Sequence, residues 1–431
     1  MVPSTASIRI FFNQPMDRVS VETRLDIDPP SAGRYVWEGN SLHFIPDISW
    51  PRGQEVTIHL AAGSRSSYFL PLLKSHHWSF QVDVPRVLFL ASDANGSILE
   101  FQSIDHEERT LLVPSPTEIL DFRVSPDGTL VSYSVMRQDG GSDLRAIDLV
   151  SEEDLLVYKC PYPMRCQNPH LSPDNDLMVF ERIELQAGVG GKWLEGFSQV
   201  MSIKLTEGSQ AMRVGSINHA HSDPHWSSQG KLAYYDETSK EIFLVDLKIQ
   251  SEPTELYSIP SELGMVGSWS PDGDFFIFPD VVILDETFQR NEVTGDEFSQ
   301  FYSHIFRLNL STGLVFDLSG TDFGLVEDAF PVYSPNGFWI AFTRKYLDED
   351  RWSPGRQLWL MRSDGTEAKQ ITQDPEYNHF SISWSPDSTL LSFVRIDQNN
   401  LTRPPEIWLY DLEKNKLVLL VSSGYLPQWV P

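Results

Sequence analysis

The sequence has few cysteines, few basic residues and no long hydrophobic segment, and each shortage excludes a class of protein. It has 2 cysteines in 431 residues, which excludes a small domain held together by a disulfide framework. No apolar run approaches the ~20 residues that a transmembrane helix needs. There are 33 lysine and arginine residues against 60 aspartate and glutamate residues, a formal net charge of −27. A surface this acidic repels phosphate backbones, which argues against nucleic-acid binding.

The acidic charge is concentrated after residue 84. Up to that residue there are 7 basic and 8 acidic residues, and 26 and 52 follow it. The strand pattern also changes here, so we predict two domains, 1–84 and 85–431. The simplest explanation of the charge on the second domain is solubility, and attraction of cations or basic partners is the alternative.

One turn sequence recurs throughout the second domain. Ser125-Pro126-Asp127-Gly128 is an intact copy, and variants begin at Ser172, Ser227, Ser270, Ser334 and Ser385. Proline presets φ, and Asp, Asn or Gly lets the chain reverse, so each copy predicts a hairpin. The residues directly before the turns, which we call the pre-turn residues, are separated by 43 to 64 positions. They are Val124, Leu171, Trp226, Trp269, Tyr333, Trp384 and, before a truncated seventh copy, Trp429.

Short strands follow each turn in the same order. In one unit they cover 390–393, 407–412 and 417–421. A similar set starting at 87–90 has no strand before it, whereas 426–430 is left over at the far end. Periods of about 40–50 residues with four strands each are typical of β-propellers. We therefore predict an all-β chain with a seven-bladed propeller, in which the C-terminal strand completes the first blade and covers its edge.

The turns and the aromatic pre-turn residues resemble the repeats of TolB-type propellers. These WD40-like modules occur in bacterial envelope proteins and in the propeller domains of prolyl-oligopeptidase-like peptidases. The resemblance covers roughly residues 86–431 and implies blade architecture, but it implies little about the ligand. Ser227-Ser228-Gln229-Gly230 departs most from the repeat, which leaves the geometry of that turn open.

The first domain has a different pattern. Alternating short strands at 8–12, 35–38, 41–45, 56–60 and 78–82 are separated by Pro and Gly turns, which predicts a small antiparallel β-sandwich. The segment is similar to the bacterial Ig-like domains of surface-layer and secreted multidomain proteins. That resemblance implies a spacer, and ligand binding is the alternative.

The two cysteines bear on the cellular compartment. Cys160 and Cys166 flank a Pro-rich loop, so they predict a disulfide, with two reduced thiols as the alternative. One such pair supplies too few ligands for a structural zinc site. A disulfide indicates an oxidising compartment, and the first residues do not form a signal peptide. We therefore expect an extracytoplasmic protein, exported or membrane-anchored, whose targeting segment is missing from this sequence.

Strand direction predicts the face on which a ligand binds. The recurring turns lie on one face, and the long insertions 184–197, 280–303, 346–356 and 397–405 lie on the other. Long loops on a rigid scaffold often carry function, and aromatic and arginine side chains suit a peptide, glycan or protein surface. A lid that packs only against itself is the alternative. The predicted binding residues are Trp193, Phe197, Tyr302, Arg344, Trp352, Arg356 and His379.

A group of histidines precedes the fourth turn. His219, His221 and His225 lie within seven residues, and His170 has the same repeat position as His225. If these imidazoles converge at the mouth of the propeller channel, they could hold a divalent metal or act as acid and base. Otherwise they are ordinary polar loop residues.

The sequence contains no familiar catalytic motif. It has no Gly-x-Ser-x-Gly, no His-Glu-x-x-His and no glycine-rich phosphate loop between a strand and a helix. We predict no catalytic residue and expect no cofactor other than this metal. The predicted function is a non-catalytic binding or scaffold module of the bacterial cell envelope, which binds a protein, peptide or glycan on the loop-rich face. The alternative is a propeller lyase or hydrolase that acts on a polysaccharide or peptide through a histidine centre.

Overall fold

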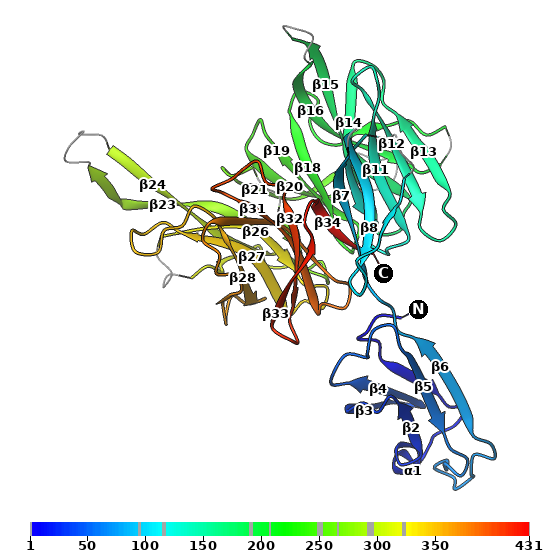
Figure 1. Ribbon diagram of the computed structural model, residues 1–431. Helices are drawn as coiled ribbons and strands as arrows, with labels where there is room; N and C mark the ends of the chain where they lie inside the picture. Colours follow the sequence, from blue (N-terminus) through cyan, green and yellow to red (C-terminus); the bar gives the residue numbers. More distant parts are fainter. Residues whose placement is uncertain are drawn as a thin grey trace. The chain divides into compact units, whose positions relative to one another are not determined.

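A computed structural model describes residues 2–93, 96–113, 118–188, 193–206, 208–247, 253–264, 267–290, 297–320 and 325–430, without the side chains of residues 93 and 283–301. The described residues form strands β1–β34 and one short helix, α1 (Arg18–Glu22), so the predicted all-β class is confirmed (Figure 1). Two compact units are present. The first runs up to Arg86 and includes Ser103–His106, and the second contains Val87–Gln102 and Glu107–Val430.

The first unit contains two three-stranded antiparallel sheets. Hydrophobic residues of both sheets contribute to one buried core around Trp50, including Ile10, Phe44 and Ile58. Alternation of buried and exposed residues in β5, for example, follows the period of two that a strand requires. In spatial order the sheets are β1 (Ile8–Phe11), β4 (Ser41–Pro46) and β3 (Gly33–Glu38), and β2 (Leu25–Asp28), β5 (Glu55–Leu60) and β6 (His76–Gln81).

The second unit is built from four-stranded meanders, which we number as sheets 1–7. Sheets 5 and 6 are joined by a single parallel pair, Ser303 with Glu327. In spatial order, sheet 1 contains β34 (Tyr425–Val430), β7 (Arg86–Asp93), β8 (Gly96–Ser103) and β9 (Arg109–Leu111); sheet 2 contains β10 (Ile119–Val124), β11 (Leu130–Met136), β12 (Ser142–Asp148) and β13 (Asp154–Lys159); and sheet 3 contains β14 (Met164–Leu171), β15 (Leu177–Ala187), β16 (Trp193–Lys204) and β17 (Met212–Arg213). Sheet 4 contains β18 (His221–Trp226), β19 (Lys231–Asp236), β20 (Glu241–Asp246) and β21 (Thr254–Pro260), and sheet 5 contains β22 (Ser268–Trp269), β23 (Phe275–Arg290), β24 (Glu297–Asn309) and β25 (Val315–Asp317). Sheet 6 contains β26 (Val326–Tyr333), β27 (Trp339–Tyr346), β28 (Gln357–Arg362) and β29 (Lys369–Gln370), and sheet 7 contains β30 (Tyr377–Trp384), β31 (Leu390–Asp397), β32 (Glu406–Asp411) and β33 (Lys416–Val421).

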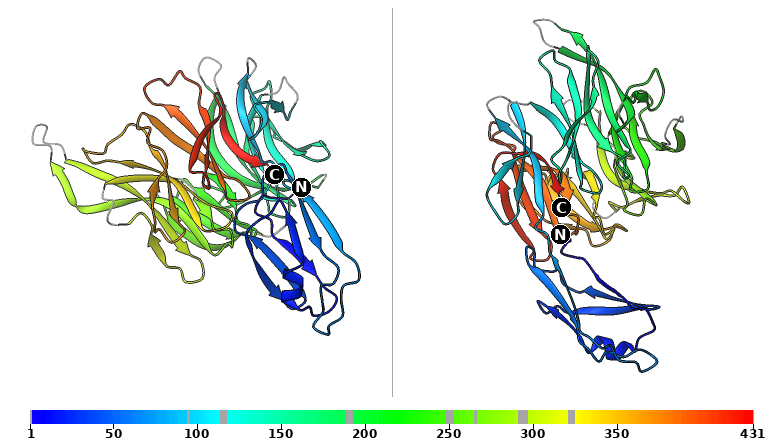
Figure 2. Two further views of the ribbon diagram at one scale, coloured as in Figure 1. Left: turned by 60° about the horizontal axis from the view of Figure 1, so that its bottom comes forward. Right: turned by 90° about the vertical axis from the view of Figure 1, so that its right-hand side faces the viewer.

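The C-terminal strand β34 lies beside β7, as the leftover strand at 426–430 predicted (Figures 1 and 2). Its Trp429 and Val430 are buried. The Gln428 side chain also bonds to β10, donating to the carbonyl oxygen of Phe122 at 3.0 Å and accepting from the backbone N–H of Val124 at 2.8 Å. Strand β34 therefore completes sheet 1 and also connects that sheet to sheet 2.

The serine of each recurring turn holds the turn together. The Ser172 hydroxyl donates to the Asp174 carboxylate at 2.5 Å and accepts from the backbone N–H of Leu177 at 3.0 Å. The hydrogen bond from Ser172 lowers the pKa of Asp174. The turn at Ser227, which departs most from the repeat, also forms: the Ser227 N–H donates to the Lys231 carbonyl oxygen at 2.7 Å. That turn is one residue shorter than the others.

The pre-turn tryptophans connect consecutive sheets. Each of four indole Nε1 atoms donates to a backbone carbonyl oxygen in the preceding sheet. The acceptor residue lies, in each case, directly before the pre-turn residue of that sheet. The pairs are Trp226 with His170 at 3.3 Å, Trp269 with His225 at 3.2 Å, Trp384 with Val332 at 3.2 Å and Trp429 with Ser383 at 3.1 Å.

Two of the predicted insertions are extensions of hairpins rather than separate loops. Strands β15 and β16 lengthen the hairpin of sheet 3, and β23 and β24 lengthen that of sheet 5, which projects far from the other strands in Figure 1. The tips of both, 189–192 and 291–296, lie outside the described residues. Among the described residues, there is no helix with the length and hydrophobicity needed to cross a bilayer.

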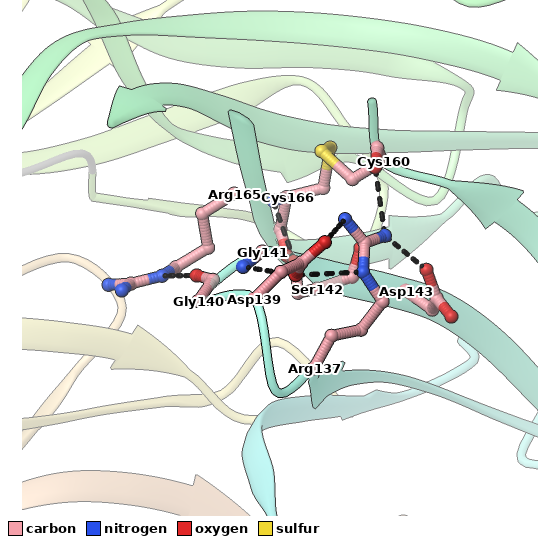
Figure 3. A network of polar contacts seen from close by, with 9 residues as sticks. All are labelled: Arg137, Asp139, Gly140, Gly141, Ser142, Asp143, Cys160, Arg165 and Cys166. Atoms are coloured by element: carbon pink, nitrogen blue, oxygen red, sulfur yellow. Dashed lines mark hydrogen bonds and ion pairs between the residues drawn. A yellow bond between two sulfur atoms is a disulfide. The ribbon is translucent and has the colours of Figure 1, made fainter. Parts of the chain in front are cut away.

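Cys160 and Cys166 are joined by a disulfide at the start of sheet 3 (Figure 3). Arg137 lies beside it and donates from Nη1 to the Cys160 carbonyl oxygen at 2.8 Å and to Asp143 at 2.6 Å. The backbone N–H of Cys166 donates to the Ser142 hydroxyl at 2.7 Å. The disulfide therefore fixes the connection between sheets 2 and 3, and Arg137, which lies between β11 and β12, holds this connection through its bond to Cys160.

Removal of residues 424–430 should destabilise the chain strongly. The truncation uncovers the edge of β7 and removes the buried Trp429 and Val430, which should lower the melting temperature by about 5–10 °C and promote aggregation. Differential scanning calorimetry and light scattering measure both effects. Trp429→Phe, which keeps the strand but loses the indole N–H, should cost only ~1 kcal/mol. A truncated chain that melts like the full one would contradict the role of β34.

The disulfide gives a prediction for protein exported to an oxidising compartment. Its intact mass without reductant should be about 2 Da below the reduced mass. Because the bond closes a short loop, replacing both cysteines with alanine should cost roughly 2 kcal/mol of the free energy of unfolding. Mass spectrometry and urea unfolding test the two effects. Two freely alkylated thiols in that preparation would contradict the prediction.

Candidate functional site

Five of the seven strands that carry a pre-turn residue share a backbone irregularity. Three residues before the pre-turn residue, Asn168, Asp223, Phe330, Ser381 and Leu426 have φ values between 52° and 54°. Four of these sites coincide with a shift in strand register. Side chains of L-residues disfavour this conformation, and a β-bulge re-aims the side chains next to it. The repeated bulge therefore determines which residues of these strands face the interior of the second unit.

A cavity of ≈ 660 Å³, which we call the channel, lies among these strands. Four of the bulge residues line it, from sheets 4, 6, 7 and 1. Arg123 of sheet 2 and His225 of sheet 4 add charged and polar side chains to its wall. The bulges thus place non-regular backbone around one common space.

Carboxylates from the preceding sheet hold two of the bulges. The Asp121 carboxylate accepts from the backbone N–H of Asn168 at 2.7 Å, and it also accepts from the Ser134 hydroxyl. Glu181 Oε1 accepts from the backbone N–H of Asp223 at 2.7 Å and from the Asn168 amide at 3.0 Å. A bulge frees a backbone N–H from the ladder, so each carboxylate satisfies a donor in the next sheet.

Asp121 is also one of two carboxylates near the half-buried Arg123. Burial lowers the pKa of Arg123, and the nearby Asp223 and Asp121 carboxylates oppose that shift. Burial raises the pKa of Asp121 and of Glu181. Arg123 Nε is buried and makes no hydrogen bond among the described residues.

His170 and His225 form the first of two histidine groups. Their rings meet edge to face with centroids 5.0 Å apart. His170 Nε2 lies 3.0 Å from the Asn168 amide oxygen, and His225 Nε2 lies 2.8 Å from the Asp223 carboxylate. Burial, together with Arg123 and His225, keeps the pKa of His170 well below its usual range, so it is neutral. The Nε2 atom of each ring is therefore already engaged by a residue of its own strand.

His219 and His221 form a different group together with Asp236. The donor atoms of these three side chains lie within 4.8 Å of one another. His219 Nδ1 is 2.6 Å and His221 Nε2 is 3.5 Å from Asp236 Oδ2. His221 begins β18 and His225 lies near its other end, roughly 13 Å away at the rise of a strand. The structure therefore divides the four predicted histidines between two groups, and of these four only His225 lines the channel.

Phe197 lies in a smaller cavity on the predicted binding face. This cavity of ≈ 300 Å³, which we call the hairpin pocket, is formed by the β15–β16 hairpin and the approach to β18. The Phe197 side chain is 68% exposed. The other lining residues are Met164, Arg182, Glu184, Gln199, Ile217, Asn218 and His219.

The remaining aromatic candidates lie elsewhere on the surface. Trp193 packs edge to face against Tyr162 of the disulfide loop, with ring centroids 5.9 Å apart. Trp352 is 57% exposed, and Lys345 Nζ lies 4.9 Å from its ring centroid. Neither residue is among those that line the hairpin pocket.

Four predicted binding residues have structural partners instead. Arg344 is only 1% exposed and makes two 2.6 Å hydrogen bonds with the buried Asp328. Tyr302 and His379 are buried as well, and Arg356 forms an ion pair with Glu327. Tyr302, Arg344 and His379 are therefore inaccessible to a ligand on the surface, because their strands turn these side chains inward.

Several polar residues of the sites were missed in the sequence. Asp121, Arg123 and Glu181 lie in ordinary strand segments, and their roles depend on contacts with other sheets that the sequence does not reveal. Asp236 ends β19 and lies 15 residues after His221. One signal was available: Asp223 and Asn168 occupy the same repeat position, and both residue types tolerate positive φ.

Comparisons with known proteins give a structural match only. No protein-family model and no curated protein matches the sequence. Puromycin hydrolase aligns with a TM-score of 0.53 at 14% identity, covering 79% of this chain and 54% of that chain. A puromycin-hydrolyzing peptidase of Mycobacterium tuberculosis gives 0.52 at 11% identity, covering 78% and 53%. TolB from Acinetobacter baumannii gives 0.45 at 13% identity, covering 95% and 83%.

These likenesses concern the fold alone. This chain spans about half the length of the two peptidases. The alignments with the two peptidases support a β-propeller architecture, with four-stranded meanders in succession, and they assign neither a reaction nor a partner.

The buried His379 predicts an acid-sensitive contribution to stability. Burial lowers its pKa to about 4, below the ~6.5 of the unfolded chain, so the unfolded state binds more protons between these values. Stability is therefore full above pH 6.5 and falls as the pH drops, by about 2 kcal/mol at pH 5. His379→Asn should reduce the difference in unfolding free energy between pH 7 and pH 5. An unchanged difference would contradict the assignment, and His106→Asn on the surface is the control.

Proposed function

We propose that sheets 1–7 are the blades of a closed seven-bladed β-propeller. Each of the six hydrophobic clusters described in the second unit lies between consecutive sheets, from sheets 1 and 2 to sheets 6 and 7. The last step, from sheet 7 to sheet 1, is supported by the Trp429 indole bond and by Gln102, which donates to the Leu420 carbonyl oxygen at 3.3 Å. The first unit, with two sheets on one core, is proposed to be an Ig-like spacer.

We further propose that the chain is a non-catalytic binding module of a bacterial cell envelope. The observation that carries this proposal is the hairpin pocket, in which an exposed phenylalanine is surrounded by arginine, glutamate, glutamine and histidine side chains. An apolar centre with polar groups around it is typical of a surface that recognises a peptide or another protein, and also suits a sugar ring. The ligand is expected to be a protein or peptide, with a glycan as the alternative.

The pocket lies on the face that strand direction predicts for binding. Phe197 lies in β16, in the extended part of the hairpin formed by the second and third strands of sheet 3, and His219 lies in the connection between sheets 3 and 4. These connections leave the sheets on the side opposite the recurring turns. The extended β15–β16 hairpin gives the pocket one of its walls, which explains why the insertion is placed there.

The disulfide supports the proposed compartment. Cys160 and Cys166 are both buried, and their pairing supports an extracytoplasmic location in an oxidising environment.

A propeller lyase or hydrolase is the second candidate. That proposal needs convergent polar groups at the channel, and the cluster around Arg123 supplies some of them. The histidines predicted for its centre are divided between two groups, which weighs against a single histidine centre. Binding is therefore the function that we favour.

Peptide and glycan arrays probed with the purified chain test the proposal. For a partner found this way, Phe197→Ala should weaken binding by roughly 1–3 kcal/mol if the pocket holds the hot spot, and Trp193→Ala or Trp352→Ala should do so if the contact extends along the face. Val150→Ala is a matched control, because Val150 is an exposed apolar residue on a turn of the opposite face. Calorimetry measures each affinity. Loss of affinity at Val150 but not at Phe197 would overturn the proposal.

A further inference from the structure

The group formed by His219, His221 and Asp236 has the composition and spacing of a metal site. It joins two imidazoles and one carboxylate whose donor atoms lie within 4.8 Å of one another. Among the described residues, it is the one group of three or more histidine, cysteine, aspartate or glutamate side chains that could hold a metal ion. Two nitrogen donors and one oxygen donor suit a first-row transition ion, whereas calcium and magnesium prefer oxygen ligands throughout. We infer that these three residues bind one divalent transition-metal ion, with Zn²⁺ as the expected occupant.

Asp236 is held in position as a ligand by its own turn. One carboxylate oxygen, Oδ1, accepts from the backbone N–H groups of Thr238 and Ser239 at 2.9 and 3.0 Å. The other, Oδ2, faces both histidines. A carboxylate fixed on one side by hydrogen bonds, with the other side free for the ion, is the arrangement found around protein-bound metals.

His221 supplies an independent observation. Its side chain is 0% exposed, and neither ring nitrogen makes a hydrogen bond among the described residues. Buried polar groups in folded proteins nearly always have a hydrogen-bond partner. This imidazole has none among the described residues, and a bound ion would supply the missing partner. Asp236 Oδ2, at 3.5 Å from Nε2, is too far to serve as that partner but suits a second ligand of the same ion.

The space beside His221 Nε2 is kept open by a glycine. Gly215 has φ +83°, and a Cβ atom added to it would lie 2.8 Å from Nε2 and 3.0 Å from the Tyr234 hydroxyl. Any side chain at this position would therefore crowd the nitrogen that faces Asp236. The glycine leaves room for an ion or its bound water.

A second His–Asp pair shows what distinguishes the site. His304 Nδ1 lies 2.7 Å from Asp317 Oδ2, nearly the same distance as between His219 and Asp236. That pair has no second imidazole near it among the described residues. A His–Asp contact is therefore not sufficient, and the buried His221 makes the difference.

Coordination by His219 requires a small change in the site. Its Nδ1 now lies 2.6 Å from Asp236 Oδ2, as in a hydrogen bond, so an ion between them needs the tautomer with the proton on Nε2. His219 also lines the hairpin pocket. With three protein ligands, the ion keeps a coordination position for water or for a ligand in that pocket. The metal site does not depend on the proposed binding function.

The test uses the full chain after removal of metals with a chelator. Titration with ZnCl₂ in a calorimeter and elemental analysis after gel filtration should both give about one zinc per chain for a single such site. His219→Ala and Asp236→Asn should each weaken zinc binding by about 100-fold or more, since each removes one of three ligands. Zinc should also raise the melting temperature of the native chain and not that of the two variants.

Two control variants distinguish zinc held at this site from zinc held by other histidines. His304→Ala removes the comparable His–Asp pair and should leave the zinc content unchanged. His225→Ala should also leave it unchanged, because His225 belongs to the channel wall. A native chain that retains no zinc, or zinc that is lost equally in the control variants, would overturn the inference. Circular dichroism checks folding, and if His219→Ala is unfolded, Asp236→Asn decides the outcome.

Discussion

The indole hydrogen bonds between consecutive sheets are the interaction on which the rest of the second unit depends. Each of the four fixes a buried or half-buried tryptophan of one sheet against the backbone of the sheet before it, at the same repeat position. Burial of such a ring contributes about 2–3 kcal/mol and the bond about 1 kcal/mol more. Because donor and acceptor recur in register, the same step from sheet to sheet is repeated, and four of the five bulge residues line one channel.

The candidate sites are products of this repetition and of its local exceptions. The bulges recur, but the residues that satisfy them differ: Asp121 and Glu181 serve only the bulges of sheets 3 and 4. This is also where Arg123, His170 and His225 gather. The approach to sheet 4 carries the separate group of His219, His221 and Asp236, and the longer hairpin of sheet 3 adds the pocket next to it. The distinctive chemistry is thus concentrated in sheets 2 to 4.

The sequence predicted what depends on local patterns. The turns, the order of strands and the partner of β34 follow from proline, glycine and the period of the repeats, which act over a few residues or by simple counting. It could not predict which side chains are buried: Arg344 looks like a ligand contact, and only the position of Asp328 on the paired strand makes it structural. Nor could it pair His221 with Asp236 rather than with His225, because that depends on the register of β18 and β19.

The pairing of β34 with β7 also sets the order in which the second unit can assemble during synthesis. Ser97 and Tyr425, whose hydroxyl groups hydrogen-bond to each other, are 328 positions apart. On the ribosome β7, β8 and β9 therefore emerge long before their fourth strand, and their sheet has an unpaired edge for most of translation. Such an edge can pair with another nascent chain. The net negative charge of the following sequence gives neighbouring chains a mutual repulsion during this interval, so the acidic composition protects an intermediate as well as the finished fold.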